Sequence, residues 1–355
     1  MVHVVNVADT GGAQTLIEAL VAHRPAGTYA GVVVLGAPGV LSGRLAAVAD
    51  RVDHLGLDPA TWRLDRLLRR VRIAVAAHRA DVVHAHLLQS DLAVALLPGR
   101  PVRVSTVHTT GLGAGDRARS RGLARVMARL SRRFAYSVAC SRQAEAYMAG
   151  AGYPPRHTVL IENGVALPGV RVARERPVFV SLSRWHPMKD HATLFRAFAR
   201  VVGRHPRYEL RCCGSGVTPD NRELTGLIAR LGLEHHVELL GPVEEPGRVL
   251  QGADALVLSS AYGEALPMAG LEALALGVPV VATDVGDCAR LCADPGLLAP
   301  PRDEVGLAEA LMRVARLGPG ERAALSVAAR GIAAASFDIR RTVAAYYELY
   351  GKVRP

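Results

Sequence analysis

The sequence predicts an α/β protein of two domains, each built on a parallel, doubly wound sheet, with the two domains facing each other across a cleft. A chain of 355 residues is longer than one hydrophobic core usually organises. Short runs rich in valine alternate with segments of helical periodicity, a pattern typical of parallel α/β sheets. The pattern restarts after Asn163-Gly164 and the basic stretch 168–177, which we interpret as a linker. We therefore expect one domain over residues 1–167 and a second over residues 168–335.

The first domain is expected to open with a strand that runs directly into a glycine pair and a helix. Predicted strands cover residues 2–7, 30–35, 81–86, 102–107, 136–140 and 158–161. The segments 13–23 and 64–78 carry apolar residues at helical spacing. Ligands of parallel sheets bind at the carboxyl ends of the strands, so the loops that follow these strands are the candidate sites.

The second domain repeats the arrangement. Predicted strands cover residues 178–182, 208–213, 237–240, 255–259 and 278–282, and predicted helices cover 193–202, 221–231, 266–276, 304–316 and 321–335. The tail 336–355 has apolar and aromatic residues at helical spacing, and we expect it to pack back on the first domain.

Composition excludes several classes of protein. Hydrophobic residues make up 50% of the chain and charged residues 21%, which argues against disorder. The five cysteines are sparse and lack the spacing of a zinc site, so we expect free thiols in a reducing cytoplasm. The start of the chain is not typical of a signal peptide, and no apolar run is long enough for a membrane span.

The net charge of +11 is concentrated in the first half, where residues 1–167 hold 20 arginines against 11 acidic residues. This imbalance suggests an anionic partner: nucleic acid, a membrane surface or a phosphorylated substrate. A nucleic-acid-binding protein is the least favoured of these, because aromatic residues make up only 5% and no recognition motif for nucleic acid is present.

The segment from Ser259 to Glu272 carries the most chemical information. It places Glu264 in the loop after a predicted strand and Glu272 eight positions later, inside an apolar run. The backbone N–H groups of Ala265 and Leu266, with Pro267 at the start of the next helix, would form an anion-binding corner. Glu272 is suited to accept hydrogen bonds from a ribose diol. The alternative is that Glu264 caps the helix and Glu272 is exposed, which leaves the position of Glu272 in the apolar run unexplained.

A second group of residues is basic. Arg184 and Lys189 lie five positions apart in the loop after the strand 178–182, a spacing that lets both reach one diphosphate. Such cations lower the barrier for departure of a phosphate leaving group. Lys189 is one of only two lysines, against 41 arginines. The alternative is a solvated basic loop.

The first domain offers glycines and histidines at strand ends. Gly11 and Gly12 let a ligand approach the backbone at the start of a helix, with Gln14 close behind. Three histidines, His84, His86 and His108, end two neighbouring strands. One such histidine is usually a packing residue, whereas three together favour some contact with a ligand.

These motifs resemble those of glycosyltransferase family 4, the retaining GT-B enzymes with two Rossmann-like domains. The match rests on Glu264 and Glu272 in a Ser-Ser-x-x-Gly-Glu-x-x-Pro setting, the following Gly-Val-Pro-Val-Val-Ala-Thr-Asp-Val-Gly, and Arg184 with Lys189. Ala265 departs from the glycine of many members.

The resemblance implies a role for each of these residues. Glu264 would contact the transferred sugar, Glu272 the ribose, and Arg184 with Lys189 the diphosphate. Gly11, Gly12 and Gly214 would border the donor, backbone groups near Val243 would hold its base, and His108 would lie near the sugar. We place Gln14, His84 and His86 on the acceptor side. The two histidines are expected to support the residues that touch the ligand rather than to touch it themselves.

The resemblance further implies a metal-independent transferase, without a cofactor, that moves a sugar from a nucleoside-diphosphate sugar to a small-molecule, glycan or lipid-linked hydroxyl. No acidic metal-binding loop follows a predicted strand. UDP is favoured as the donor nucleotide. The alternatives are a GDP-mannose-dependent mannosyltransferase and a nucleotide-sugar epimerase, which would need an acid and a base that we cannot place.

Residues 117–133 combine seven arginines with apolar residues at helical spacing. They could form a membrane-surface helix that serves a lipid acceptor. We favour an ordinary helix with its apolar side on the domain and its arginines in water. A third interpretation is that these arginines recognise an anionic acceptor.

Overall fold

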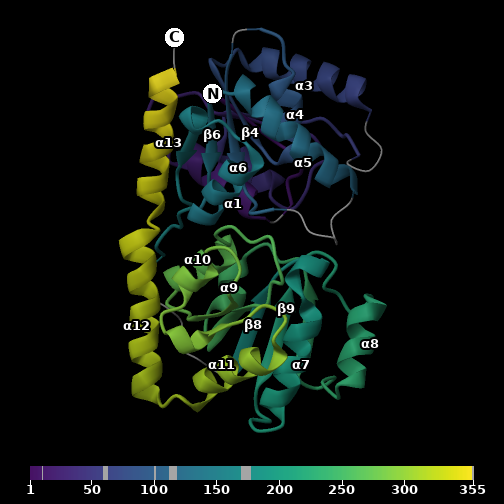
Figure 1. Ribbon diagram of the computed structural model, residues 1–355, viewed down its shortest axis with the longest axis vertical. Helices are drawn as coiled ribbons and strands as arrows, with labels where there is room; N and C mark the ends of the chain where they lie inside the picture. The colour runs from purple at the N-terminus through teal and green to yellow at the C-terminus, as the bar shows by residue number, and fades with distance from the viewer. Residues whose placement is uncertain (10, 59–62, 100, 112–117, 169–176, 354–355) are drawn as a thin grey trace. The chain divides into compact units, whose positions relative to one another are not determined.

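The computed structural model describes residues 1–9, 11–58, 63–99, 101–111, 118–168 and 177–353 (Figure 1). The chain divides into two compact units. The first unit comprises Met1–Gly164 together with Ile339–Pro355, and the second comprises Val165–Asp338. The sequence placed the first boundary at residue 167 and the start of the returning tail at residue 336.

The first unit is built on one parallel sheet with the strand order β3-β2-β1-β4-β5-β6-β7. The strands are β1 Val2–Val5, β2 Gly31–Val34, β3 Arg51–His54, β4 Val82–His86, β5 Val102–Val107, β6 Tyr136–Ala139 and β7 Thr158–Leu160. The helices are α1 Gly12–Ala22, α2 Ser42–Val48, α3 Leu64–His78, α4 Leu88–Ala95, α5 Ala118–Leu130, α6 Arg142–Ala151 and α13 Ile339–Val353. The α/β architecture predicted from the alternating pattern is therefore confirmed.

The two faces of this sheet are covered by different helices. One core cluster joins α1 and α2 to Val343, Tyr346 and Tyr350 of α13. The other cluster joins α3, α4 and Met127 of α5 to the opposite face. Strands β1 and β4 are buried along their whole length, as expected for central strands of a parallel sheet.

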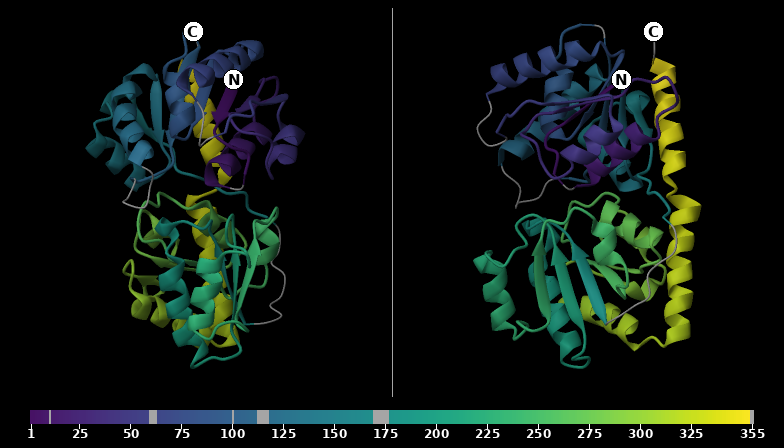
Figure 2. Two further views of the ribbon diagram at one scale, coloured as in Figure 1. Left: turned by 90° about the vertical axis from the view of Figure 1, so that its right-hand side faces the viewer. Right: turned by 180° about the vertical axis from the view of Figure 1, so that it is seen from behind.

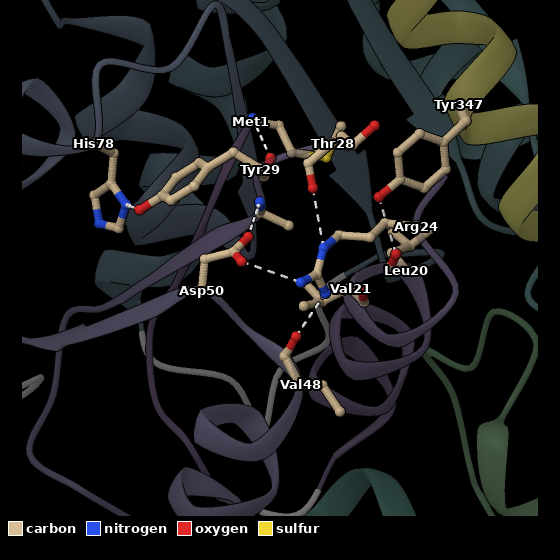
Figure 3. A network of polar contacts seen from close by, with 11 residues as sticks. Met1, Leu20, Val21, Arg24, Thr28, Tyr29, Val48, Asp50, His78 and Tyr347 are labelled. Carbon is tan, nitrogen blue, oxygen red and sulfur yellow. Dashed lines mark hydrogen bonds and ion pairs between the residues drawn. The ribbon is translucent and has the colours of Figure 1, made fainter. Parts of the chain in front are cut away.

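A polar network fixes the edge of the first unit where the chain starts (Figure 3). The guanidinium of Arg24 donates to backbone oxygens of Val21 and Val48 at 2.8 and 2.6 Å, and to the Asp50 carboxylate at 3.2 Å. The hydroxyl of Tyr347, on α13, donates to the backbone oxygen of Leu20 at 3.0 Å. The network ties the end of α1 to the start of β3 on one side and to α13 on the other.

The second unit is also built on one sheet, whose strands are seen in Figure 2. The sheet is parallel and has the strand order β10-β9-β8-β11-β12-β13. The strands are β8 Val178–Leu182, β9 Glu209–Cys213, β10 Val237–Gly241, β11 Ala255–Leu258, β12 Val280–Thr283 and β13 Leu298–Ala299. The helices are α7 His191–Val202, α8 Arg222–Arg230, α9 Pro246–Leu250, α10 Met268–Ala275, α11 Glu304–Arg316 and α12 Pro319–Ser336. Helices α7, α8 and α11 pack on one face, and α9, α10 and α12 on the other.

Both sheets have the same switch point. In the first sheet, β2 and β3 follow β1 on one side, and β4 then pairs with β1 on its other side. In the second sheet, β9 and β10 follow β8 on one side, and β11 pairs with β8 on its other side. The loops that follow the two central strands therefore diverge and leave room for a ligand at their carboxyl ends. In the first unit these loops follow β1 and β4, and in the second they follow β8 and β11.

Helix α5 lies within the predicted arginine-rich segment. Its residues Met127 and Ala128 are buried, whereas Arg125 and Arg129 are exposed. The apolar side of the helix is thus used for packing inside the unit, as the ordinary-helix interpretation expects. Residues 112–117, and with them Arg117, lie outside the described residues. None of the described helices is both long and apolar enough to cross a membrane.

We expect Asp91, in α4, to make the stability of the first unit depend on pH. Its buried carboxylate accepts a hydrogen bond from the Ser105 hydroxyl at 2.8 Å, and burial raises its pKa to about 7. The folded state then holds a proton that the unfolded state has lost, so stability falls as pH rises from about 4 to about 7. Asp91→Asn carries no charge and should raise Tm by about 5 °C or more at pH 8, with a much smaller gain at pH 4.5.

Thermal unfolding of both proteins across this pH range checks the expectation, since the effects of other titrating groups cancel in the difference. Asp81→Asn, at an exposed aspartate just before β4, is the matched control and should show no such trend. An Asp91→Asn gain that is constant with pH would contradict it.

Candidate active site

The loops that follow β8 and β11 are joined to each other at the switch point of the second unit. The hydroxyl of Ser259 donates to the backbone oxygen of Lys189 at 2.8 Å. The backbone N–H of Ala261 donates to the backbone oxygen of Met188 at 2.7 Å. These two bonds hold the predicted basic loop against the predicted acidic loop.

Lys189 and Glu264 form a buried ion pair at this junction. The ammonium of Lys189 donates to Oε1 of Glu264, and the Ser260 hydroxyl donates to the same oxygen at 2.6 Å. Glu264 is 6% exposed, and the Lys189 side chain is 17% exposed. Burial alone would raise the pKa of Glu264, but Lys189, the Ser260 hydroxyl and the charge of Arg184 together hold it below its ordinary value. The carboxylate is therefore ionised at neutral pH.

Local structure fixes the position of Lys189. It ends a single 3-10 turn, Pro187–Lys189, whose Met188 N–H donates to the ring of His186 at 3.2 Å. The next residue, Asp190, has a left-handed backbone (φ 46°). Its carboxylate caps α7 by accepting hydrogen bonds from the backbone N–H of Thr193 at 3.2 Å and from the Thr193 hydroxyl at 2.7 Å. The lysine is thus held between a turn and a helix cap.

Arg184 lies earlier in the same loop and has an exposed side chain. The residues on either side of Arg184 are hydrogen-bonded to the end of β9 and the turn after it. The backbone N–H of Ser183 donates to the backbone oxygen of Cys213 at 2.9 Å, and that of Trp185 donates to the backbone oxygen of Ser215 at 2.7 Å. Gly214 has φ +149°, and a Cβ there would lie 2.2 Å from the Ser183 oxygen. Gly214, predicted to border the donor, thus permits the close backbone contact that positions the arginine loop.

Helix α10 begins after Pro267 and carries Glu272, whose side chain is partly exposed. The side chains of Ala265 and Leu266 are buried, so a ligand would meet their backbone rather than their side chains. Val243 lies in the loop after β10 and is partly exposed. The structure thus places the predicted donor-binding residues of this domain on the loops that follow β8, β9, β10 and β11 and on α10.

Gly286 supports Glu264, a function that sequence reasoning missed. It has φ +63°, and a Cβ there would lie 2.1 Å from the Glu264 backbone oxygen. The next residue, Asp287, donates its N–H to the Ala265 oxygen at 2.8 Å. The loop after β12 therefore supports the acidic loop from behind. Gly286 is the last residue of the Gly-Val-Pro-Val-Val-Ala-Thr-Asp-Val-Gly motif, so the sequence did mark this glycine. The motif does not indicate that the glycine packs against Glu264, which lies in another loop.

The first unit holds a chain of imidazoles along its central strands. His3 on β1 contacts His86 on β4 (Nδ1 to Nε2, 3.2 Å), and His86 contacts His108 after β5 (Nδ1 to Nε2, 3.2 Å). His84 contacts the hydroxyls of Tyr350 at 2.6 Å and Thr106 at 2.8 Å. His3, His84 and His86 are fully buried, whereas His108 is partly exposed. Of these four described rings, that of His108 is the one accessible to a ligand.

Desolvation keeps these rings neutral. Burial lowers the pKa of His3 to about 3 and that of His108 to about 4, and it places those of His84 and His86 well below the ordinary value. Sequence reasoning missed His3, although β1 pairs with β4 so that His3 lies beside His84. Nitrogens of His3, His84 and His86 lie within 4.8 Å of one another, close enough to hold a metal ion. Both nitrogens of His84 already have hydroxyl partners, so coordination would require breaking one of these bonds.

The glycine loop after β1 is stabilised by Gln14. This side chain is buried, and its amide donates to the backbone oxygen of Val7 at 3.0 Å. A Cβ on Gly11 would lie 2.7 Å from the Gln14 side-chain oxygen. Gly12 begins α1. Gln14, predicted on the acceptor side, thus shapes the loop at which a ligand would arrive.

Comparison with known proteins gives matches over both units. The family described as Glycosyltransferase Family 4 matches residues 10–167, and the family described as Glycosyl transferases group 1 matches residues 176–316. The D-inositol 3-phosphate glycosyltransferase of Geodermatophilus obscurus is 31% identical over 300 residues, which are 74% of this chain and 64% of that protein. An exopolysaccharide phosphotransferase of Streptomyces coelicolor is 43% identical over 129 residues, 35% of this chain and 13% of that protein. The chain thus spans less than two thirds of the length of these curated relatives.

Two solved structures share the fold over nearly the whole chain. Anabaena HepE, solved in complex with UDP and glucose, superposes with a TM-score of 0.83 at 21% identity and covers 99% of both chains. Sucrose-phosphate synthase of Thermosynechococcus elongatus gives a TM-score of 0.81 at 22% identity, covering 99% of this chain and 98% of that one. Together with the two family matches, the two parallel sheets and the paired acidic and basic loops, these results show that the chain is a GT-B protein that belongs to glycosyltransferase family 4.

Proposed function

We propose that the protein transfers a sugar from a UDP-sugar to a hydroxyl acceptor, with retention of configuration and without a metal ion. The observation that carries the proposal is the buried Lys189–Glu264 ion pair at the switch point, with Arg184 in the same loop. A carboxylate and two cations at the carboxyl ends of β8 and β11 suit a sugar joined to a diphosphate. The UDP and UDP-glucose complexes of Anabaena HepE support UDP as the nucleotide.

In this proposal the cations act on the leaving group. The bond between the sugar C1 and the diphosphate oxygen breaks, and its electron pair stays on that oxygen. Lys189 and Arg184 stabilise the negative charge that develops there. The acceptor oxygen bonds to C1 from the same face, and its proton passes to the departing phosphate oxygen. Glu264 binds sugar hydroxyls, Glu272 binds the ribose, and His108 of the first unit contacts the sugar.

A lipid-linked acceptor is the second candidate, and one relative supports it. The phosphatidyl-myo-inositol mannosyltransferase of Mycolicibacterium smegmatis is 32% identical over 146 residues, 40% of this chain and 36% of that protein. Arg125, Arg129, Arg132 and Arg133 are exposed on or just after α5, while Met127 is buried. Contact with an anionic inner membrane face would then be electrostatic and salt-sensitive rather than insertion of an apolar face. Sedimentation with anionic and neutral vesicles at two salt concentrations tests this contact.

The first test is a binding screen with UDP-sugars, GDP-sugars and a nucleic-acid duplex. A ligand that binds only the folded protein, at a concentration of 100 times its Kd, adds about 2.7 kcal/mol to the free energy of unfolding. Thermal unfolding detects a change of this size. We expect stabilisation by a UDP-sugar and none by the duplex. Stabilisation by GDP-mannose alone would favour the mannosyltransferase alternative, and an epimer as product would favour the epimerase.

We expect Lys189→Ala to lower kcat by about two orders of magnitude or more, as the loss of charge stabilisation usually does. The variant also removes the opposite charge from the buried Glu264 carboxylate, which destabilises the fold. The double variant Lys189→Met/Glu264→Gln removes both charges and should regain stability without regaining activity. Lys352→Ala, at the only other lysine of the chain, is the control and should keep both. Wild-type kcat in Lys189→Ala would remove this lysine from the mechanism.

The two glutamates should have separable effects. Glu272→Ala should weaken UDP binding by about 1–3 kcal/mol, the cost of losing hydrogen bonds to a charged group. Glu264→Ala should lower kcat more than UDP affinity, because its partner is the transferred sugar. Calorimetric titration with UDP, together with steady-state kinetics, measures both quantities. Equal losses of UDP affinity in the two variants would argue against this division of roles.

The stereochemistry of the product tests the mechanism. An α-configured donor should give an α-linked product, and activity should persist in EDTA because protein cations replace a divalent ion. The coupling constant of the anomeric proton in the product NMR spectrum decides the configuration. A β-linked product would require a base on the opposite face of the sugar and would exclude the same-face mechanism.

A further inference from the structure

Three imidazoles form a hydrogen-bonded line that runs from the core of the first unit to its partly exposed end. The line joins His3 to His86 and His86 to His108, each through an Nδ1–Nε2 contact of 3.2 Å. His3 and His86 are fully buried, and His108 is partly exposed. The inner two rings can therefore influence a substrate only through the third.

The two contacts force all three rings into the same tautomer. A neutral imidazole has one N–H and one lone pair, and desolvation keeps these rings neutral. If His3 donates from Nδ1, then His86 accepts at Nε2, donates from its own Nδ1, and His108 accepts at Nε2. His108 then carries its proton on Nδ1. In the opposite arrangement every ring is protonated at Nε2, and His108 offers a lone pair at Nδ1.

The surroundings of His3 choose between these two arrangements. Its Nε2 is buried and has no hydrogen-bond partner among the described residues. The opposite arrangement would put an N–H at this atom, and buried N–H groups without a partner are rarer than buried acceptors without one. The unpartnered position of Nε2 therefore favours a lone pair at this atom and, along the line, an N–H at His108 Nδ1.

His84 supports the line from the side. Its ring lies 4.0 Å from that of His86, centroid to centroid, at 37°. The hydroxyls of Thr106 and Tyr350 hold its two nitrogens, and Tyr346 holds Thr106 at 3.0 Å. Both tyrosines belong to α13. The plane of the His86 ring is thus packed against a neighbour that has its own fixed partners.

We propose that His3 and His86 are positioning residues that fix His108 as a hydrogen-bond donor at Nδ1. The proposal rests on the proposed function in one respect, that His108 contacts the sugar. A donor at that point binds a sugar hydroxyl or a phosphate oxygen and cannot accept the acceptor's proton. His108 then contributes to binding and orientation, while the departing phosphate takes the proton.

The decisive measurement is the protonation of each ring nitrogen in the full chain labelled with ¹⁵N-histidine. Long-range ¹H–¹⁵N correlation spectra distinguish protonated from unprotonated ring nitrogens and need no substrate. At pH 7.5 we expect His108 to be protonated at Nδ1 and unprotonated at Nε2. Protonation at Nε2, or a mixture of both forms, would overturn the proposal even if the protein proves to be a glycosyltransferase.

A pair of variants at His3 tests whether the inner ring sets this state. His3→Asn keeps an N–H close to the position of Nδ1, whereas His3→Leu removes it. We expect His3→Asn to retain the His108 Nδ1–H signal, and His3→Leu to give a mixture of tautomers and about a tenfold lower kcat/KM. His23→Ala, at an exposed histidine after α1, is the control for both readouts.

Two outcomes would count against the relay. An unchanged His108 spectrum and an unchanged kcat/KM in folded His3→Leu would show that the inner ring does not act on the outer one. Joint shifts of the His3, His84 and His86 signals with one equivalent of Zn²⁺, accompanied by thermal stabilisation, would show that the rings are metal ligands instead. If His3→Leu fails to fold, the wild-type spectrum still decides the tautomer.

Discussion

The ion pair between Lys189 and Glu264 is the interaction on which the second unit's site depends. Two charges removed from water are tolerated only when each has a close partner and the remaining hydrogen-bonding capacity is filled. Here the Ser260 hydroxyl adds a second donor to the same carboxylate oxygen. The Ser259 and Ala261 contacts hold the two loops together, and Gly286 lets a third loop approach from behind. The contacts that stabilise the charges of Lys189 and Glu264 therefore also hold these two side chains at the carboxyl ends of β8 and β11.

The first unit meets the same constraint with neutral groups. Its switch point also lies between two fully buried parallel strands, β1 and β4, and most polar side-chain atoms of these strands have partners inside the unit. Histidines fill this position because each neutral ring can both donate and accept. The tyrosine hydroxyls of α13 complete the set. One unit thus presents a fixed charge pattern, and the other presents a fixed hydrogen-bonding pattern.

Features of the fold and the site that depend on neighbouring residues in the sequence could be predicted, whereas contacts between residues far apart in the sequence could not. The central strands, the glutamate pair and the basic loop are local patterns, and they were predicted. Strand β3 was missed because Arg51 and Asp53 interrupt its apolar character at the half-exposed edge of the sheet. The contacts of His3 with His86, and of Gly286 with Glu264, depend on strand register and loop packing, to which no local pattern points. The direct pairing of Lys189 with Glu264 joins residues 75 positions apart.

The passage of the chain between the units has a consequence for how the protein is made. The chain leaves the first unit after Gly164 and returns at Ile339, so the second unit is one continuous segment while the first is not. During synthesis the ribosome completes the whole second unit before it releases α13, which supplies the tyrosines that close the histidine face. The second unit can therefore fold as the chain emerges. The first unit must wait for α13, and until that helix emerges the apolar surface that it covers stays exposed to solvent.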